Sequence, residues 1–158
     1  MKTHLNPPAL DPSTVRTRVG SSYPSPYSRP CAERVRQALG DASGLSQFGV
    51  NLLTLPSGAW SSQRHWHEHE DEFVYVLEGQ VVLVTDAGEQ PLGPGMAAGF
   101  PAGRRDGHHL VNRSERPARV LEVGTRAPQD EGEYSDIDMK FVADGSEARF
   151  LHKNDEPY

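Results

Sequence analysis

Five of the seven histidines in this 158-residue chain fall into two short segments, with a spacing suited to holding a metal ion. In the first segment, His65 and His67 flank one tryptophan, and residues i and i+2 of an extended strand point to the same face. Two imidazole rings on one face can chelate a single divalent ion, with nitrogen–metal distances of about 2.0–2.1 Å. We therefore expect both rings to project into one interior, with Trp66 on the opposite face.

Glu72 begins an apolar run shortly after these histidines. On a straight strand its parity would place it on the face opposite to His67, so we expect the polar residues 68–71 to form a bend or bulge that resets the register. The run from Glu72 is apolar on both faces, which indicates a strand covered on both sides. A carboxylate at the start of such a strand needs a partner, because burying an isolated charge is costly, and a metal ion is the simplest partner.

The second histidine segment places His108 and His109 side by side, far along the chain. Parity puts His108 with Leu110 and Asn112 on one face of a strand, and His109 on the other. On spacing alone, either histidine can supply a fourth ligand. His69, two residues after His67, is expected in the bend at residues 68–71, with a surface or supporting role.

The elements that must position these residues are short strands. Residues 1–30 contain six prolines and predict an extended arm, whereas residues 31–39 are good helix formers followed by Gly40 at a C-cap position. Short apolar runs separated by glycine or proline then recur, as in an all-β sandwich or barrel. The runs are Phe48–Leu55, Glu72–Leu77, Gln80–Thr85, Gly95–Phe100, His108–Asn112 and Arg119–Val123, with residues 137–142 and 148–152 as two further edge strands.

The bulk composition narrows the class of protein. A chain of this length predicts one domain, and the single cysteine, Cys31, excludes an internal disulfide, as is usual in the reducing cytoplasm. We see no secretory signal and no apolar stretch near the roughly 20 residues of a membrane helix, so we expect a cytoplasmic protein without a membrane partner. The net charge of −6, without a lysine-rich stripe, argues against nucleic-acid binding.

Two sequence motifs in the right order show a family resemblance. Residues 58–79 read G-A-W-S-S-Q-R-H-W-H-E-H-E-D-E-F-V-Y-V-L-E-G, which resembles the first cupin motif: glycine, H-x-H, four residues, E, six residues, G. Residues 95–112 read G-M-A-A-G-F-P-A-G-R-R-D-G-H-H-L-V-N, which resembles the second: glycine, five residues, P-x-G, a gap, then H-x-x-x-N. The resemblance covers about residues 48–123. Within the family, the chain is most similar to bacterial single-domain cupins, some of which are labelled sugar-phosphate-isomerase-like.

This resemblance implies a fold and a ligand set. The fold is an all-β, cupin-type double-stranded β-helix (jelly-roll) barrel with an extended N-terminal arm and one short helix. It divides the chain into an arm and short helix (1–47), the barrel (48–126) and C-terminal strands or tail packing on the barrel (127–158). The family's ligands fall on His65, His67, Glu72 and His108, and Asn112 matches the closing asparagine. His109 is then expected to face outward. They would hold one divalent ion: Zn, Mn, Fe, Ni or Co.

The expected function is metal-dependent chemistry on a small molecule. A mixed nitrogen and oxygen ligand set leaves one or two coordination positions open, as a catalytic metal requires. We expect an isomerase, lyase or dioxygenase; the alternatives are a metabolite sensor without turnover and a structural homodimer with a vestigial metal. A homodimer is expected in any case, since cupins commonly pair through their sheets. Arg104 or Arg105, near the cavity mouth, and Asn112 are candidate substrate contacts, because arginine suits carboxylate and phosphate groups.

Overall fold

The computed structural model describes residues 5–145 and 147–158, which form twelve strands, one α-helix and two 3-10 turns. The strands are β1 (Thr17–Val19), β2 (Val35–Ala38), β3 (Phe48–Leu55), β4 (Glu72–Glu78), β5 (Val81–Thr85), β6 (Gly88–Leu92), β7 (Ala97–Phe100), β8 (His109–Val111), β9 (Ala118–Thr125), β10 (Gln129–Glu133), β11 (Lys140–Asp144) and β12 (Glu147–Leu151). The helix α1 spans Leu39–Ala42, and the 3-10 turns η1 and η2 span Pro12–Thr14 and Arg29–Cys31.

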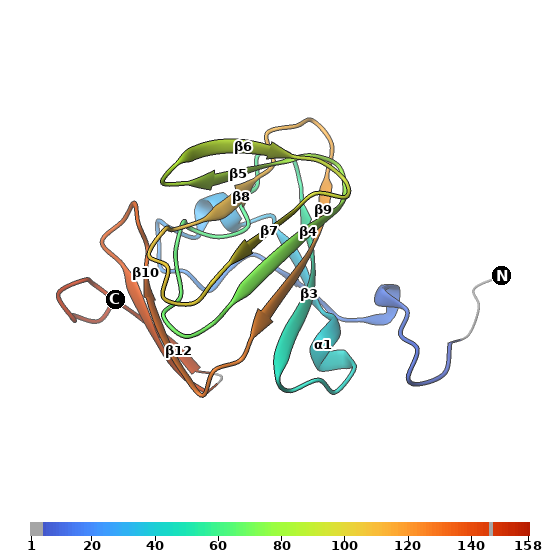
Figure 1. Ribbon diagram of the computed structural model, residues 1–158, viewed down its shortest axis with the longest axis horizontal. Coiled ribbons are helices and arrows are strands. Elements are labelled where there is room, and N and C mark those ends of the chain that lie inside the picture. The colour runs from blue at the N-terminus through green and yellow to red at the C-terminus, as the bar shows by residue number, and fades with distance from the viewer. Residues whose placement is uncertain (1–4, 146) are drawn as a thin grey trace.

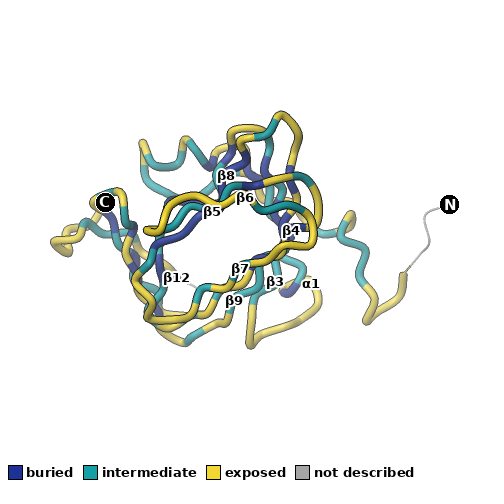
Figure 2. Tube along the Cα trace, turned by 45° about the horizontal axis from the view of Figure 1, so that its top comes forward, coloured by how far each residue is buried: buried dark blue, intermediate teal, exposed yellow. Residues whose placement is uncertain are grey.

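Two facing sheets build the barrel. One has the strand order β1-β2-β3-β9-β4-β7 and the other β6-β5-β8, with every pairing antiparallel. Figure 2 shows β5, β6 and β8 on one side of the interior and β7, β9 and β3 on the other. A third sheet, β10-β11-β12, stands at one side of the barrel, whereas the first described residues extend away on the other side (Figure 1). The expected all-β jelly-roll fold is confirmed.

The apolar core fills one end of the barrel and leaves the other end polar. Alternate residues point inward, so that Leu53 of β3, Val120 of β9 and Val76 of β4 lie opposite one another and are fully buried. The core also contains Leu55, Ala59, Val74, Val81, Leu83, Leu110 and Ala118. Further along the same inward face the sequence changes to Glu122 on β9 and Glu72 on β4. The inward-facing positions therefore pass from a packed core into a polar chamber.

The N-terminal arm and the third sheet close the polar end together. Tyr134, Met139 and Phe141 form a second buried cluster, against which Tyr23 and Tyr27 of the arm pack. The Tyr23 ring meets the Tyr134 ring edge-on at 5.4 Å. Both terminal segments thus bury aromatic surface beside the histidines, and the Tyr134 ring lies 5.6 Å from the His65 ring.

The helix expected over residues 31–39 is wrong. Only Leu39–Ala42 is helical, and Val35–Ala38 is strand β2, paired with β1 on one side and β3 on the other. Two rows of sheet hydrogen bonds and a half-buried position outweigh the modest helix propensity of this segment. Among the described residues, no helix has the length and hydrophobicity needed to cross a membrane.

The outer face of β4 also differs from expectation. Glu72, Val74 and Val76 face the interior, whereas Phe73, Tyr75 and Leu77 are 44%, 38% and 45% exposed. The described part of the chain therefore does not cover this strand on both sides. The apolar residues lie on the outside of the larger sheet, where no element within residues 5–145 and 147–158 packs over them.

Candidate metal centre

His65 and His67 meet at the polar end of the barrel, in an irregular segment between β3 and β4. This segment is held on both sides: the His65 amide donates to the His108 carbonyl at 3.2 Å, and the Trp66 amide donates to the Glu133 carbonyl at 3.3 Å. It is not a regular strand, although His65 forms isolated bridges to His108 and Tyr134. The two rings nevertheless converge, with their Nε2 atoms 3.0 Å apart.

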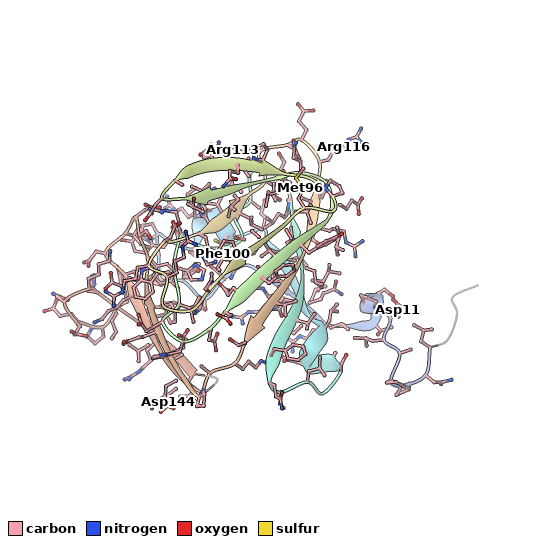
Figure 3. The ribbon with its side chains drawn as sticks, in the orientation of Figure 1. Asp11, Met96, Phe100, Arg113, Arg116 and Asp144 are labelled. Carbon is pink, nitrogen blue, oxygen red and sulfur yellow. The ribbon has the colours of Figure 1, made fainter. Side chains whose placement is uncertain are left out.

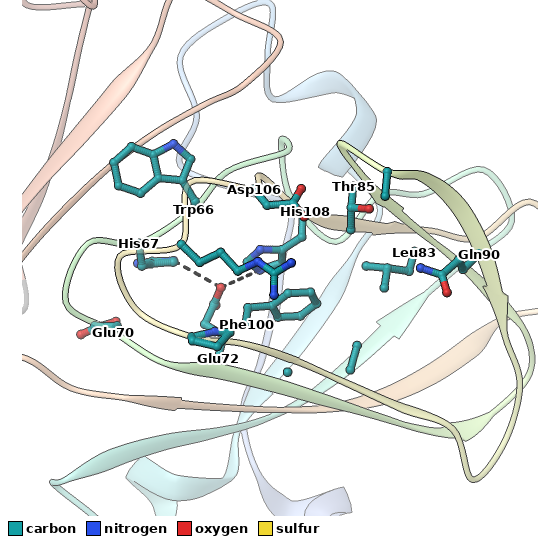
Figure 4. A pocket seen from close by; sticks show the side chains of 15 residues that line it. Trp66, His67, Glu70, Glu72, Leu83, Thr85, Gln90, Phe100, Asp106 and His108 are labelled. Atoms are coloured by element: carbon teal, nitrogen blue, oxygen red, sulfur yellow. Dashed lines mark hydrogen bonds and ion pairs between the residues drawn. The ribbon is translucent and has the colours of Figure 1, made fainter.

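Glu72 completes a compact group with these rings. A bend at residues 68–69 turns the chain before β4, so that Glu72 faces the interior, as the expected change of register requires. One of its oxygens, Oε2, lies 3.4 Å from His67 Nε2, 3.8 Å from His65 Nε2 and 2.8 Å from His108 Nε2. Figure 4 shows His67 and His108 approaching Glu72 from two sides. The structure thus brings all four residues named from the sequence to one carboxylate oxygen.

Neighbouring groups aim each ring at this point. His65 Nδ1 donates to the Gln63 carbonyl at 2.8 Å, and His67 Nδ1 donates to Asp130 Oδ2 at 2.5 Å. A proton held on Nδ1 leaves the Nε2 lone pair free, which is the tautomer that a metal-binding histidine needs. The His108 ring is instead fixed by Phe100, stacked on it at 3.5 Å and nearly parallel.

The charges in the group fit a cation. Burial, followed by the neighbouring His67, lowers the pKa of His65 to about 3, so this ring is neutral at physiological pH. Burial alone would raise the pKa of Glu72, but the hydrogen bond with His108 and the charges of His67 and His65 lower it well below its usual range. A carboxylate and neutral imidazole nitrogens facing one another are a suitable donor set for a divalent ion such as zinc. The residues present therefore fit the metal that the sequence implies.

His67 behaves differently from His65. Burial disfavours its charged form, but the hydrogen bond to Asp130 and the charges of Glu72, Asp130 and Glu70 outweigh burial and raise its pKa. Without a metal, a proton on His67 satisfies these carboxylates. A metal ion would take the place of that proton.

His109 points away from the group. Its Nδ1 contacts the Ser62 carbonyl at 2.9 Å and its ring meets Trp60 edge-on, so of the two adjacent histidines only His108 reaches Glu72. The expectation that His109 faces outward is wrong, because its side chain is 5% exposed and packs beneath Trp60. Trp66 also differs from expectation. It borders a cavity with His67, since the segment is not a regular strand.

The candidate substrate contacts lie in different surroundings. Arg104 is exposed and borders the same 220 Å³ cavity as Trp66 and His67. Arg105 is 73% exposed, lies 3.6 Å from Glu68 and covers the Trp66 ring at 5.0 Å. Asn112 is fully buried and borders no described cavity, and its amide group bonds the Leu55 and Arg116 carbonyls and the Ser114 amide. Asn112 therefore shapes the turn after β8.

Three residues of the site were not found from the sequence. Asp130, Arg36 and Glu122 come from β10, β2 and β9, and each borders a cavity shared with His65 and His67. The first of these cavities measures 330 Å³ and the second 290 Å³. Nothing in the polar run around Asp130 marks it, and the helix-forming residues around Arg36 gave no sign that this side chain faces the barrel interior.

Replacing Asp130 with asparagine is expected to weaken binding of a divalent metal by about 10–100-fold while the fold is retained. The carboxylate is buried, bonds His67 Nδ1 and accepts the His69 amide, so the amide variant keeps the shape but loses the charge that orients and polarises the ring. Competition with a chromophoric chelator gives the affinity, and circular dichroism checks the fold. Unchanged affinity in a folded variant would show that Asp130 does not act through His67.

Comparison with known proteins agrees with this fold. Residues 51–124 match the model of the cupin domain family. A solved structure from Silicibacter pomeroyi, named as a sugar phosphate isomerase from a cupin superfamily, is 49% identical over 96% of each chain, with a TM-score of 0.92. One from Acidithiobacillus ferrooxidans, whose name also refers to a sugar phosphate isomerase, is 31% identical over 80% of this chain and 81% of that chain, with a TM-score of 0.73. The polyketide cyclase RemF from Streptomyces resistomycificus is 25% identical over 74% of this chain and 78% of that chain, with a TM-score of 0.58.

No curated protein matches this chain. The family assignment thus stands on the family model, which spans the strands around the histidine and glutamate group, and on a solved cupin that is similar along nearly the whole chain. The chain belongs to the cupin superfamily.

Proposed function

We propose that this cupin binds one divalent metal ion through His65, His67, Glu72 and His108, and uses it as an enzyme acting on a small anionic molecule. One observation supports the proposal above the others: the Nε2 atoms of three histidines approach a single carboxylate oxygen at 2.8–3.8 Å, at the wall of a cavity. No core-packing requirement explains such a grouping, since buried polar side chains cost stability without partners.

The bound metal would supply Lewis acidity or, for a redox-active ion, electron transfer. Three nitrogen donors and one oxygen donor leave room for a substrate oxygen if the ion is five- or six-coordinate. Zn, Mn, Fe, Ni and Co all accept this donor set, and the donor types alone do not select among them. The protein's own part is to fix the rings through Gln63, Asp130 and Phe100, and to keep bulk water from the buried side of the group.

The reaction class that we favour is isomerisation of a phosphorylated sugar or a similar small carboxylate. Two similar solved structures bear names of this kind, one of them 49% identical over nearly the full length. Lyase and dioxygenase chemistry are the other reactions that such a metal centre can support. The cavities of 220 and 330 Å³ beside the group suit a small substrate.

We also propose that two copies of the chain pair through the outer face of β4. Phe73, Tyr75 and Leu77 form an exposed apolar stripe there, and apolar surface of this kind is stabilised by burial against a partner. Light scattering after size exclusion is expected to give twice the chain mass. A monomer at micromolar concentration would contradict this pairing.

One experiment tests the proposed enzyme. The purified chain is analysed for metals, then incubated with sugar phosphates and small carboxylic acids under air and under nitrogen. We expect about one equivalent of a divalent metal and turnover that does not depend on dioxygen. Dioxygen-dependent turnover would select the oxygenase, tight binding without turnover would select a metabolite sensor, and absence of a metal would overturn the proposal.

A further inference from the structure

Two arginines at the start of β2, Arg34 and Arg36, border the same 330 Å³ cavity as His65, His67 and Glu72. Because they are two residues apart on an extended segment, both side chains point to the same face. Arg36 lies opposite Leu53, whose side chain is fully buried in the core, so this face is the interior of the barrel. The β2 wall thus places two guanidinium groups in the chamber that holds the histidine and glutamate group.

The Arg34 side chain is buried in this wall and held there by hydrogen bonds. It is 8% exposed, its Nε donates to the Gly20 carbonyl at 3.0 Å, and one of its terminal nitrogens donates to the Ser61 carbonyl. These contacts fix the guanidinium but bring no negative charge to it. Burial, and next the charge of Arg36, lower the pKa of Arg34, which shows that the two cations repel each other in this wall.

Among the described residues, the two cations of this wall share one carboxylate at ion-pair distance, although Glu70 and Glu72 border the same cavity. Within residues 5–145 and 147–158, Glu122 is the one carboxylate at ion-pair distance from either arginine, 3.0 Å from a terminal nitrogen of Arg36. In addition, Arg36 Nε is buried and has no hydrogen-bond partner in the described part of the chain. A buried cation without a counter-charge and a buried donor without an acceptor both cost stability, unless a ligand supplies the missing anion.

We propose that Arg34 and Arg36 bind the oxyanion group of the substrate, a phosphate ester or a carboxylate, while another oxygen of the same molecule reaches the metal. This inference rests on the proposed function. It assigns the anionic group of the proposed substrate to the β2 wall. The planar fork of arginine matches phosphate and carboxylate oxygens, and water competes less for the buried Arg34 and the half-buried Arg36 than for exposed arginines. The alternative pair, Arg104 and Arg105, is exposed to solvent, and Arg105 already faces Glu68.

The test is calorimetric titration of the full-length, metal-loaded chain with inorganic phosphate at constant ionic strength, with acetate as a second arm. Arg36→Gln is expected to weaken phosphate binding about tenfold or more, as expected when a charge-assisted hydrogen bond is lost. Arg36→Lys keeps the charge but not the planar fork, so its phosphate affinity is expected to lie between those of wild type and Arg36→Gln. Arg113→Gln is the matched control, because Arg113 is an exposed arginine on the loop after β8 and is paired with Glu89 of β6. In Figure 3, Arg113 lies at the opposite end of the molecule from Asp144.

A second variant keeps the inference falsifiable if Arg36→Gln does not fold. Glu122→Gln removes the carboxylate that competes for Arg36, so phosphate affinity is expected to rise several-fold, whereas a purely structural role for the Arg36–Glu122 pair would lower it or leave it unchanged. Phosphate affinity that is equal in wild type and Arg36→Gln, or that falls only in Arg104→Ala/Arg105→Ala, overturns the inference. Should the chain bind no metal, the same series without metal still tests the arginines, so the two proposals fail separately. Stronger acetate than phosphate binding would select a carboxylate substrate.

Discussion

Replacing His67 with alanine is expected to weaken binding of a divalent metal at neutral pH by at least about a hundredfold, the share of one ligand in a site of four. His67 Nε2 lies 3.0 Å from His65 Nε2 and 3.4 Å from Glu72 Oε2, within the proposed ligand group. Its loss leaves three donors, His65, His108 and Glu72, to hold the ion. Elemental analysis after dialysis and chelator competition measure the metal content and the affinity.

His69→Ala is the matched control for this variant. It removes a histidine of the same short segment, but the His69 side chain is exposed and lies outside the group that can hold an ion. Metal affinity within about twofold of wild type is expected. If both variants lost the metal equally, the histidine-rich segment would act as a loose surface chelator, and if neither did, the ligand set proposed here would be wrong.

Metal affinity is expected to fall as the pH is lowered from 7.5 to 5.5, by at most about tenfold per pH unit for one competing proton. His67 has a raised pKa, so a proton competes with the metal for this ring more strongly than for a free imidazole. His65, with a pKa of about 3, is neutral over this whole range and adds no competition. Chelator competition at several pH values measures the slope.

The stability that the metal adds to the fold is expected to fall with pH in the same direction as the metal affinity. A His67 pKa above its unfolded value stabilises the metal-free fold below about pH 6.5, and this contribution is lost as the pH rises through the folded pKa. The metal contributes most at high pH, so the difference in melting temperature between metal-loaded and metal-free protein is expected to shrink from pH 7.5 to 5.5. In Asp130→Asn, which lacks the bond that raises this pKa, the decline is expected at lower pH. Equal differences at both pH values would contradict the account.

The sequence predicted the barrel strands well because each is a short apolar run ended by glycine or proline. β3 has the bounds of the run 48–55, and β4 begins at Glu72 as expected. The change of register before Glu72 was also foreseen, since only a bend lets a carboxylate five residues after His67 face the same interior. Local pattern was enough for these features, because a strand's period and its turns are encoded within a few residues.

What could not be foreseen depends on contacts between distant segments. β2 has helix-forming residues, and only its place between β1 and β3 makes it a strand. β6 and β10 lack an apolar run, so no periodicity marks them. Asp130 reaches His67 from 63 positions along the chain, a pairing that neither segment signals by itself. The supporting residues of the site were therefore hidden in strands that the pattern does not mark.

The most direct test of the central claim is a crystal of the metal-loaded protein measured at the absorption edge of the bound ion. The account predicts a single anomalous peak about 2.0–2.2 Å from Nε2 of His65, His67 and His108 and from a carboxylate oxygen of Glu72. A peak elsewhere, or the absence of any peak at full metal occupancy in solution, would contradict it.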